Sequence, residues 1–131
     1  MNTLNQTKYK LLIVEDEEEN QKFLLFLLSK LFETDICPND VGFYEKIKSK
    51  DYNIFLVDIA LKGSKNGLEL IKELRQNEKY KNIPVVCLTA HAFNKDKENA
   101  MAAGADIYLT KPLPNQVLID SLFNLLKVKS K

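Results

Sequence analysis

The sequence predicts an α/β domain in which a parallel sheet is covered by helices on both faces. Two observations predict this class. Short runs rich in Val, Ile and Leu recur along the chain, and continuous apolar runs are typical of strands buried on both faces. Segments with helical patterning lie between them. The 131 residues suffice to bury one core, so we expect a single domain over residues 1–131 with its core at about 10–127.

The expected strands are bounded by turn or charged residues. In the first and third, KLLIV and IFLVDI, nearly every side chain is apolar, so no alternation marks a solvent-facing side. The segment TDIC is the weakest of the set. Together these segments predict strands over residues 10–14, 34–37, 54–59, 83–89 and 106–111.

Helix signals separate the strands. An acidic cluster precedes the first helix, and an Asn66-Gly67 turn precedes the third. Gly104 fits the position just after the fourth helix, and Pro114 lies in the first turn of the fifth. The repeated β–α order implies right-handed crossovers and helices on both faces of the sheet. The expected helices cover residues 20–32, 41–48, 67–76, 94–103 and 114–127.

Composition narrows the class of function. The formal net charge of +1 indicates no strong attraction to nucleic acid or anionic lipid. The longest apolar run, residues 23–28, is far shorter than the roughly 20 residues that span a bilayer, so no membrane insertion is expected. The polar start of the chain lacks a secretory pattern. These features favour a cytoplasmic protein.

Polar side chains follow the expected strands at their carboxyl ends. Glu15 and Asp16 follow the first strand, Asp58 closes the third, Thr89 the fourth and Lys111 the fifth. Parallel strands end at one edge of the sheet, where ligands bind in folds of this class. Clustered carboxylates suit Mg²⁺, which prefers oxygen ligands and phosphate. An aspartate beside a metal is also a nucleophile for phosphoryl groups. The sequence therefore predicts Mg²⁺-dependent phosphoryl chemistry at this edge of the sheet.

The same residues lie in motifs that resemble a family. LLIVEDEEEN, IFLVDIAL with NGLELI, IPVVCLTAHAF and AMAAGADIYLTKPL resemble the response-regulator receiver domains of two-component signalling, in family order and spacing. The resemblance implies a flavodoxin-like (βα)5 fold with strand order 2-1-3-4-5. It implies a phosphoacceptor that takes a phosphoryl group from a histidine kinase or histidine phosphotransfer protein, then switches conformation to control a partner. The last motif most resembles the receivers of hybrid kinases.

The resemblance also implies the role of each acidic residue. Asp58 matches the phosphoacceptor. Asp16 matches a direct ligand of Mg²⁺, and the backbone carbonyl of Ala60 matches a further ligand. Glu15 matches a neighbouring acid that acts through water.

Residues of the last two strands match the remaining parts of the site. Thr89 and Lys111 match the groups that stabilise the phosphoryl oxygens. Thr89 and Tyr108 match a switch pair, in which the ring swings inward as the hydroxyl moves. The bond before Pro112 is commonly cis in the family, so a cis peptide is expected here.

Two further expectations depend on the resemblance. The loop at residues 61–67 is longer than usual, and Lys62 stands where a proline is common, so the shape of this loop is open. Cys37 and Cys87 lie three strands apart in the implied order, roughly 14 Å. That separation exceeds the limit of about 7 Å between Cα atoms of a disulfide, so we expect free thiols.

The first helix carries more apolar residues than one buried face needs. At helical spacing, Leu25 and Phe26 point away from the face formed by Leu24, Leu27, Leu28 and Leu31. An exposed Leu-Phe pair is a candidate docking patch for the helical domain that donates phosphate. The alternatives are scattered surface hydrophobes or cover from a neighbouring chain.

Two other functions compete with a phosphorylated receiver, which is not expected to be a stand-alone enzyme. One is a degenerate receiver that binds partners without phosphorylation, although every key position is intact. The other is a phosphatase of the haloacid dehalogenase type, whose nucleophile follows the first strand in an Asp-x-Asp pattern. Here that segment offers only Asp16-Glu17-Glu18.

Overall fold

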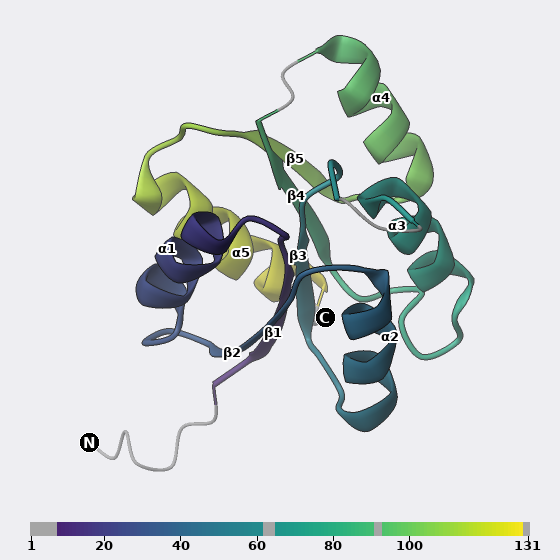
Figure 1. Ribbon diagram of the computed structural model, residues 1–131, viewed down its shortest axis with the longest axis horizontal. Coiled ribbons are helices and arrows are strands. Elements are labelled where there is room, and N and C mark those ends of the chain that lie inside the picture. Colours follow the sequence, from purple (N-terminus) through teal and green to yellow (C-terminus); the bar gives the residue numbers. More distant parts are fainter. Residues whose placement is uncertain (1–7, 62–64, 91–92, 130–131) are drawn as a thin grey trace.

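A five-stranded parallel sheet forms the centre of the computed structural model, which describes residues 8–61, 65–90 and 93–129. Its strands stand in the order β2-β1-β3-β4-β5, as the resemblance implies (Figure 1). The shape of the loop at 61–67 stays open, because residues 62–64 lie outside the described residues. The strands are β1 (Lys10–Val14), β2 (Glu33–Cys37), β3 (Ile54–Val57), β4 (Val85–Thr89) and β5 (Ile107–Thr110).

Helices cover both faces of the sheet, which confirms the predicted class. The helices α1 (Glu18–Leu28) and α5 (Asn115–Lys129) lie on one face (Figure 1). The other face carries α2 (Asp40–Ser49), α3 (Gly67–Gln76) and α4 (Asn94–Ala103). Each face has its own cluster of buried hydrophobic side chains.

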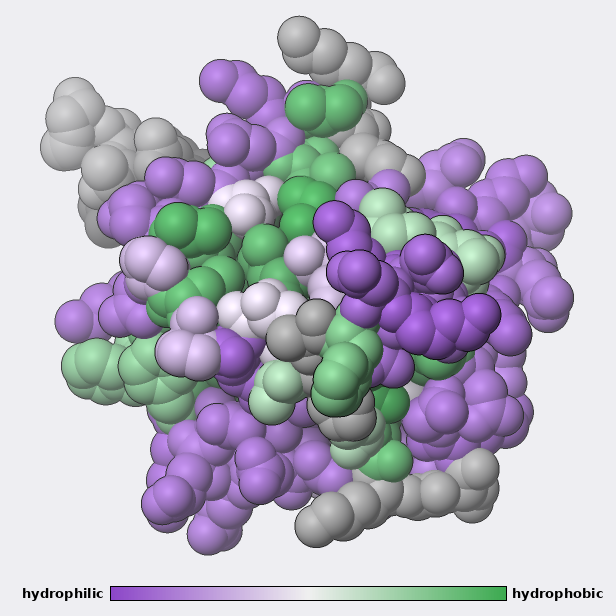
Figure 2. Space-filling model, turned by 90° about the horizontal axis from the view of Figure 1, so that it is seen from above, coloured by the Kyte–Doolittle hydropathy of each residue, from purple (hydrophilic) through white to green (hydrophobic). Residues whose placement is uncertain are grey.

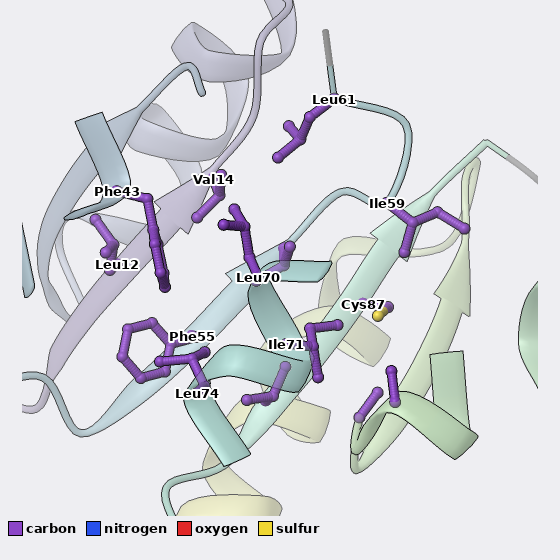
Figure 3. Close-up of a cluster of buried hydrophobic side chains, with 14 of the residues drawn as sticks. Leu12, Val14, Phe43, Phe55, Ile59, Leu61, Leu70, Ile71, Leu74 and Cys87 are labelled. Carbon is purple, nitrogen blue, oxygen red and sulfur yellow. The ribbon is translucent and has the colours of Figure 1, made fainter. Parts of the chain in front are cut away.

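The central strands are buried because both of their faces are covered. All four residues of β3 and all five of β4 are buried. Parallel pairing sets Val14 of β1 beside Val57 of β3, and Val57 beside Cys87 of β4. Figure 3 shows the cluster on the α2–α4 face, where Phe55 lies between side chains of α2 and α3. The continuous apolar runs therefore mark buried strands, as predicted.

The strands β3 and β4 are shorter than predicted. Pairing of β4 begins at Val85 because Pro84 has no N–H, although its carbonyl accepts from Phe55 N at 3.0 Å. Past the end of β3, Asp58 N still donates to Val14 O at 3.0 Å, but the chain then turns away. The expected strand over 54–59 is therefore too long at its end.

The prediction was wrong about the end of α1, which was expected at residue 32. The helix ends at Leu28, and Leu31 and Phe32 close a turn by donating to the carbonyl of Leu28. Glu33 N then donates to Tyr9 O at 2.9 Å, which begins the pairing of β2 with β1. Phe32 is buried in this turn, whereas Leu31 is 38% exposed and is not part of the buried helix face.

The other helices follow the prediction within two residues. The predicted bounds of α3 and α4 match the structure. Asn66 caps α3 through a capping box with Glu69. Gly104 ends α4 with a φ of 120°, a conformation that favours glycine.

Arg75 joins the elements at the opposite edge of the sheet from Asp58. Its Nε donates to Gly104 O at 2.8 Å, and one terminal nitrogen donates to Ile83 O at 2.7 Å. The other terminal nitrogen pairs with Asp106 Oδ2 at 2.9 Å, and the same oxygen accepts from Val85 N. The guanidinium therefore ties α3 to the end of α4 and to the starts of β4 and β5.

Candidate functional site

The carboxyl ends of β1, β3, β4 and β5 meet around one cavity. Its volume is about 190 Å³, and these strand ends lie at the upper edge of the sheet in Figure 1. Figure 2 looks down on this edge, where hydrophobic surface lies among polar side chains. The structure thus brings together the residues that the sequence placed at the strand ends. The cavity is lined by Asp16, Glu17, Asp58, Ala60, Thr89, Ala90 and Lys111.

Asp58 lies at the base of this cavity and is 8% exposed. Its Oδ1 accepts a hydrogen bond from the backbone N–H of Ala60 at 2.9 Å. Its Oδ2 lies 3.7 Å from the Nζ of Lys111. The carboxylate is thus oriented by its own turn and has a cationic neighbour, which offsets the cost of burying a charge.

Glu15 is the most buried acid of the site, at 2% exposed. One carboxylate oxygen lies 3.3 Å from Lys111 Nζ, and the other accepts from Glu17 N at 3.0 Å. Burial raises the pKa of the Glu15 carboxyl above its ordinary value, against the opposing effect of the Glu17 N–H and the Lys111 ammonium. Glu15 and Asp58 therefore share one ammonium.

Lys111 reaches the cavity from the end of β5. Its backbone N–H donates to Thr89 O at 2.8 Å, which continues the pairing of β5 with β4. The peptide bond between Lys111 and Pro112 is cis, as expected. The side chain is largely buried between the two acids.

The donor set around the cavity fits a hard divalent cation. Asp16 is half-buried at the rim and Asp58 lies at the base, while Ala60 is exposed at the cavity wall. Within the described residues, no three acidic, His or Cys side chains form a cluster that could hold a metal. Two carboxylates with a backbone carbonyl and water suit Mg²⁺, which uses few protein ligands. The residues present therefore fit Mg²⁺.

Thr89 and Tyr108 lie on neighbouring strands and face the same side of the sheet. Thr89 is fully buried, and Tyr108 packs against the cluster on the α2–α4 face. The register pairs Cys87 with Tyr108, two residues before Thr89. Burial raises the pKa of the Tyr108 hydroxyl, with further effects from nearby groups that include Asp58. In this structure the ring is half-buried.

The two cysteines are free, as predicted, and both are buried. Burial raises the pKa of the Cys37 thiol to about 12 and that of Cys87 to about 12. Neither is a reactive thiolate near neutral pH.

The candidate docking patch differs from the prediction in one residue. Phe26 is 74% exposed, and Lys30 Nζ lies 5.8 Å from its ring centroid. Leu25 is half-buried, so the two residues of the pair are not equally exposed. Phe23, which precedes Leu24 on the same helix, is 48% exposed.

An apolar cavity beside Phe23 was not predicted. Its volume is about 230 Å³, and it separates α1 from the loop between β5 and α5. Its walls come from segments far apart in the sequence, so no local pattern could indicate it. It is lined by Asn20, Phe23, Leu24, Leu88, Lys111, Pro112, Leu113, Asn115 and Leu118.

Among the helices of the described residues, none is long and apolar enough to cross a membrane.

Comparison with known sequences identifies the relatives of this chain. A hybrid signal transduction histidine kinase G of Dictyostelium discoideum is 36% identical over 108 residues, which is 79% of this chain and 3% of the relative. A chemotaxis protein CheY homolog of Campylobacter jejuni is 28% identical over 120 residues, 89% of this chain and 92% of the relative. The chain thus spans only a small part of the hybrid kinases that it matches.

Solved structures share the fold over nearly the whole chain. The receiver domain of a sensor histidine kinase from Pseudomonas aeruginosa has a TM-score of 0.83 at 26% identity, over 92% of this chain and 99% of that one. That structure holds a magnesium ion in its active site cleft. A putative response regulator from Chloroflexus aurantiacus has a TM-score of 0.87 at 27% identity, with 92% and 99% covered.

The family model described as response regulator receiver domain matches residues 11–123. The match includes the four strand ends that surround the cavity and every residue proposed for the site. The chain therefore belongs to the response regulator receiver domain family of two-component systems.

Proposed function

We propose that this chain accepts a phosphoryl group on Asp58 from the phosphohistidine of a histidine kinase or a histidine phosphotransfer protein. An oxygen of the Asp58 carboxylate attacks the phosphorus atom. The new O–P bond forms as the P–N bond breaks, and the imidazole leaves with the electron pair of that bond. The observation that carries the proposal is the buried Asp58 carboxylate, open to a cavity and 3.7 Å from Lys111 Nζ.

The neighbouring side chains have separate roles in this proposal. Lys111 moves from its two acids to the phosphoryl oxygens, and its charge offsets theirs. The Thr89 hydroxyl donates to another of these oxygens. Asp16, Asp58 and the Ala60 carbonyl hold Mg²⁺, with Glu15 acting through water. When bound, Mg²⁺ neutralises negative charge that the carboxylates and the phosphoryl group bring together.

Phosphorylation then changes a surface away from Asp58. As Thr89 moves toward the phosphoryl group, the Tyr108 ring occupies the space that it leaves. The half-buried state of the ring supports this role, because a small inward movement completes its burial. The change reaches the surface of α4, β5 and α5, where a downstream partner distinguishes the two states.

The experiment that tests the proposal is phosphorylation by acetyl phosphate in the presence of Mg²⁺. We expect a mass increase of one phosphoryl group in the native chain and none in Asp58→Asn. Reductive cleavage with borohydride followed by peptide mapping then identifies the modified residue. Label on Asp16 would support the phosphatase alternative, and the absence of label would support a degenerate receiver.

The phosphodonor docks on α1 and on the apolar cavity beside it. Phe23 and Lys111 line this cavity, and the exposed ring of Phe26 follows three residues later on the same side of α1. The docking patch proposed from sequence, Leu25 and Phe26, is thus centred on Phe26. Phe26→Ser should slow transfer from the cognate donor and leave acetyl phosphate labelling unchanged. Val41→Ser is the matched control, because Val41 is 60% exposed on the opposite face.

We also propose a domain organisation, a location and a class of partner for this chain. Residues 1–131 form one receiver domain that functions in the cytoplasm. It assists its own phosphorylation and dephosphorylation without being a stand-alone enzyme. It acts through protein partners rather than through direct contact with nucleic acid or insertion into a membrane, in keeping with its net charge of +1.

A further inference from the structure

The first residue of α3 rests on the turn that carries the phosphoacceptor. Gly67 N donates to Ile59 O at 3.2 Å. A Cβ built on Gly67 would lie 2.7 Å from the Cα of Ile59 and closer still to the carbonyl oxygen of Asp58. Real side chains do not approach a backbone this closely. The helix and the turn can therefore touch only because residue 67 has no side chain.

The helix that makes this contact is also held by a cap at its start and by buried side chains along its length. Asn66 Oδ1 accepts from Glu69 N at 3.1 Å, and Glu69 Oε1 accepts from Asn66 N at 3.0 Å. Leu70 and Ile71 are fully buried, and Leu74 is buried nearly as completely. A helix capped and packed in this way does not yield easily when the turn moves.

Side chains on either side of Ala60 hold the turn from within. Ile59 is 6% exposed and Leu61 is 8% exposed, whereas Ala60 between them is exposed at the cavity. Figure 3 shows Ile59 and Leu61 in the cluster that also contains Leu70 and Ile71 of α3. Two buried neighbours thus present the Ala60 backbone to the cavity.

We infer that Gly67, Ile59 and Leu61 are positioning residues of the phosphoacceptor site. The contact of α3 with the turn sets the Asp58 carboxylate relative to the Ala60 carbonyl, and with it the affinity of the site for Mg²⁺. The inference rests on the proposed function. None of the three residues touches the phosphoryl group. A displacement of reacting groups by about 1 Å lowers rates by about a hundredfold. A small shift of this turn should therefore slow phosphorylation of Asp58.

Two variants test the inference, with a control in the same helix. Gly67→Ala adds a Cβ that clashes with the turn at Asp58 and Ile59. Leu61→Ala removes a buried side chain of the turn and introduces no clash. Leu74→Ala is the matched control, because it removes a buried leucine from the same cluster at the other end of α3. Each variant is titrated with Mg²⁺ by calorimetry, unfolded in urea, and labelled with acetyl phosphate over a range of Mg²⁺ concentrations.

We expect Gly67→Ala and Leu61→Ala to raise the Mg²⁺ dissociation constant about tenfold. We expect labelling at saturating Mg²⁺ to slow by about tenfold or more. Leu74→Ala should lose as much stability as Leu61→Ala, yet bind Mg²⁺ within about twofold of the native chain. Equal Mg²⁺ affinities in Leu61→Ala and Leu74→Ala would overturn the inference, whether or not Gly67→Ala folds. A native chain that takes no label at all would instead overturn the proposed function.

Discussion

Replacement of Arg75 by alanine should cost more stability than any surface substitution in this chain. The guanidinium donates short hydrogen bonds to Gly104 O, Ile83 O and Asp106 Oδ2, at 2.8, 2.7 and 2.9 Å. Its side chain is 18% exposed and that of Asp106 is 20% exposed, so water screens the pair only in part. Longer hydrogen bonds reach Tyr80 O and Lys81 O, so Arg75→Ala leaves four carbonyls and one carboxylate without this donor.

The size of the effect follows from these contacts. A hydrogen bond to a charged group contributes about 1.5–3 kcal/mol, and the removal of one partner from a buried ion pair costs about 3–5 kcal/mol. The free energies of these contacts do not add, because the groups belong to one hydrogen-bond network. Asp106 Oδ2 also keeps its hydrogen bond from Val85 N in the variant. We therefore expect a loss of about 3–5 kcal/mol in the free energy of unfolding, a large part of the roughly 5–15 kcal/mol of a typical domain.

Urea unfolding followed by circular dichroism measures this loss. Arg75→Lys should recover only part of it, because an ammonium replaces the ion pair but not the planar fork of donors. Lys72→Ala, on the exposed side of the same helix, should change stability by at most about 0.5 kcal/mol. A loss below about 1 kcal/mol for Arg75→Ala would show that the guanidinium is not the tie between α3, α4 and β5.

Three further predictions follow from individual contacts. Asn39→Ala removes the side-chain cap of α2 at Gly42 N and should lower the free energy of unfolding by about 1 kcal/mol in urea. Burial opposes ionisation of Asp35, but hydrogen bonds from Tyr52 and Lys50 outweigh it and lower the pKa of the carboxyl below its ordinary 3.8. Its contribution to stability is thus present above pH 3.8 and is lost as pH falls through the lowered pKa. The melting temperature should fall more steeply below pH 3.8 in the native chain than in Asp35→Asn, and parallel curves would contradict this. Finally, the methyl group of Ala60 cannot orient an attacking water, so phosphorylated chain kept without a phosphatase should lose its label slowly, and decay within seconds would be evidence against this.

Much of the fold could be predicted because local signals and burial agree. The bounds of α3 follow from the Asn66 cap and those of α4 from Gly104, both local features. The end of α1 could not be predicted, because residues 29–32 contain neither glycine nor proline. The helix stops there so that Glu33 can pair with β1, a tertiary demand.

Some features of the site could likewise be predicted from the sequence, and others could not. The positions of Asp58, Thr89 and Lys111 follow from where apolar runs end, because a parallel sheet gathers those ends at one edge. The sharing of Lys111 by Glu15 and Asp58 depends on side-chain geometry across three strands. The resemblance supplied the expected cis bond at Pro112, which no periodicity indicates.

The two ends of α4 are held to the rest of the domain to different degrees. Its buried residues, Ala100 and Ala103, lie near its end, where Arg75 holds Gly104. At its start, Phe93 is 75% exposed and provides no side-chain cap. Such a segment opens locally at a free energy well below that of global unfolding. The start of α4 is therefore the end that opens more easily, while its other end is held by Arg75.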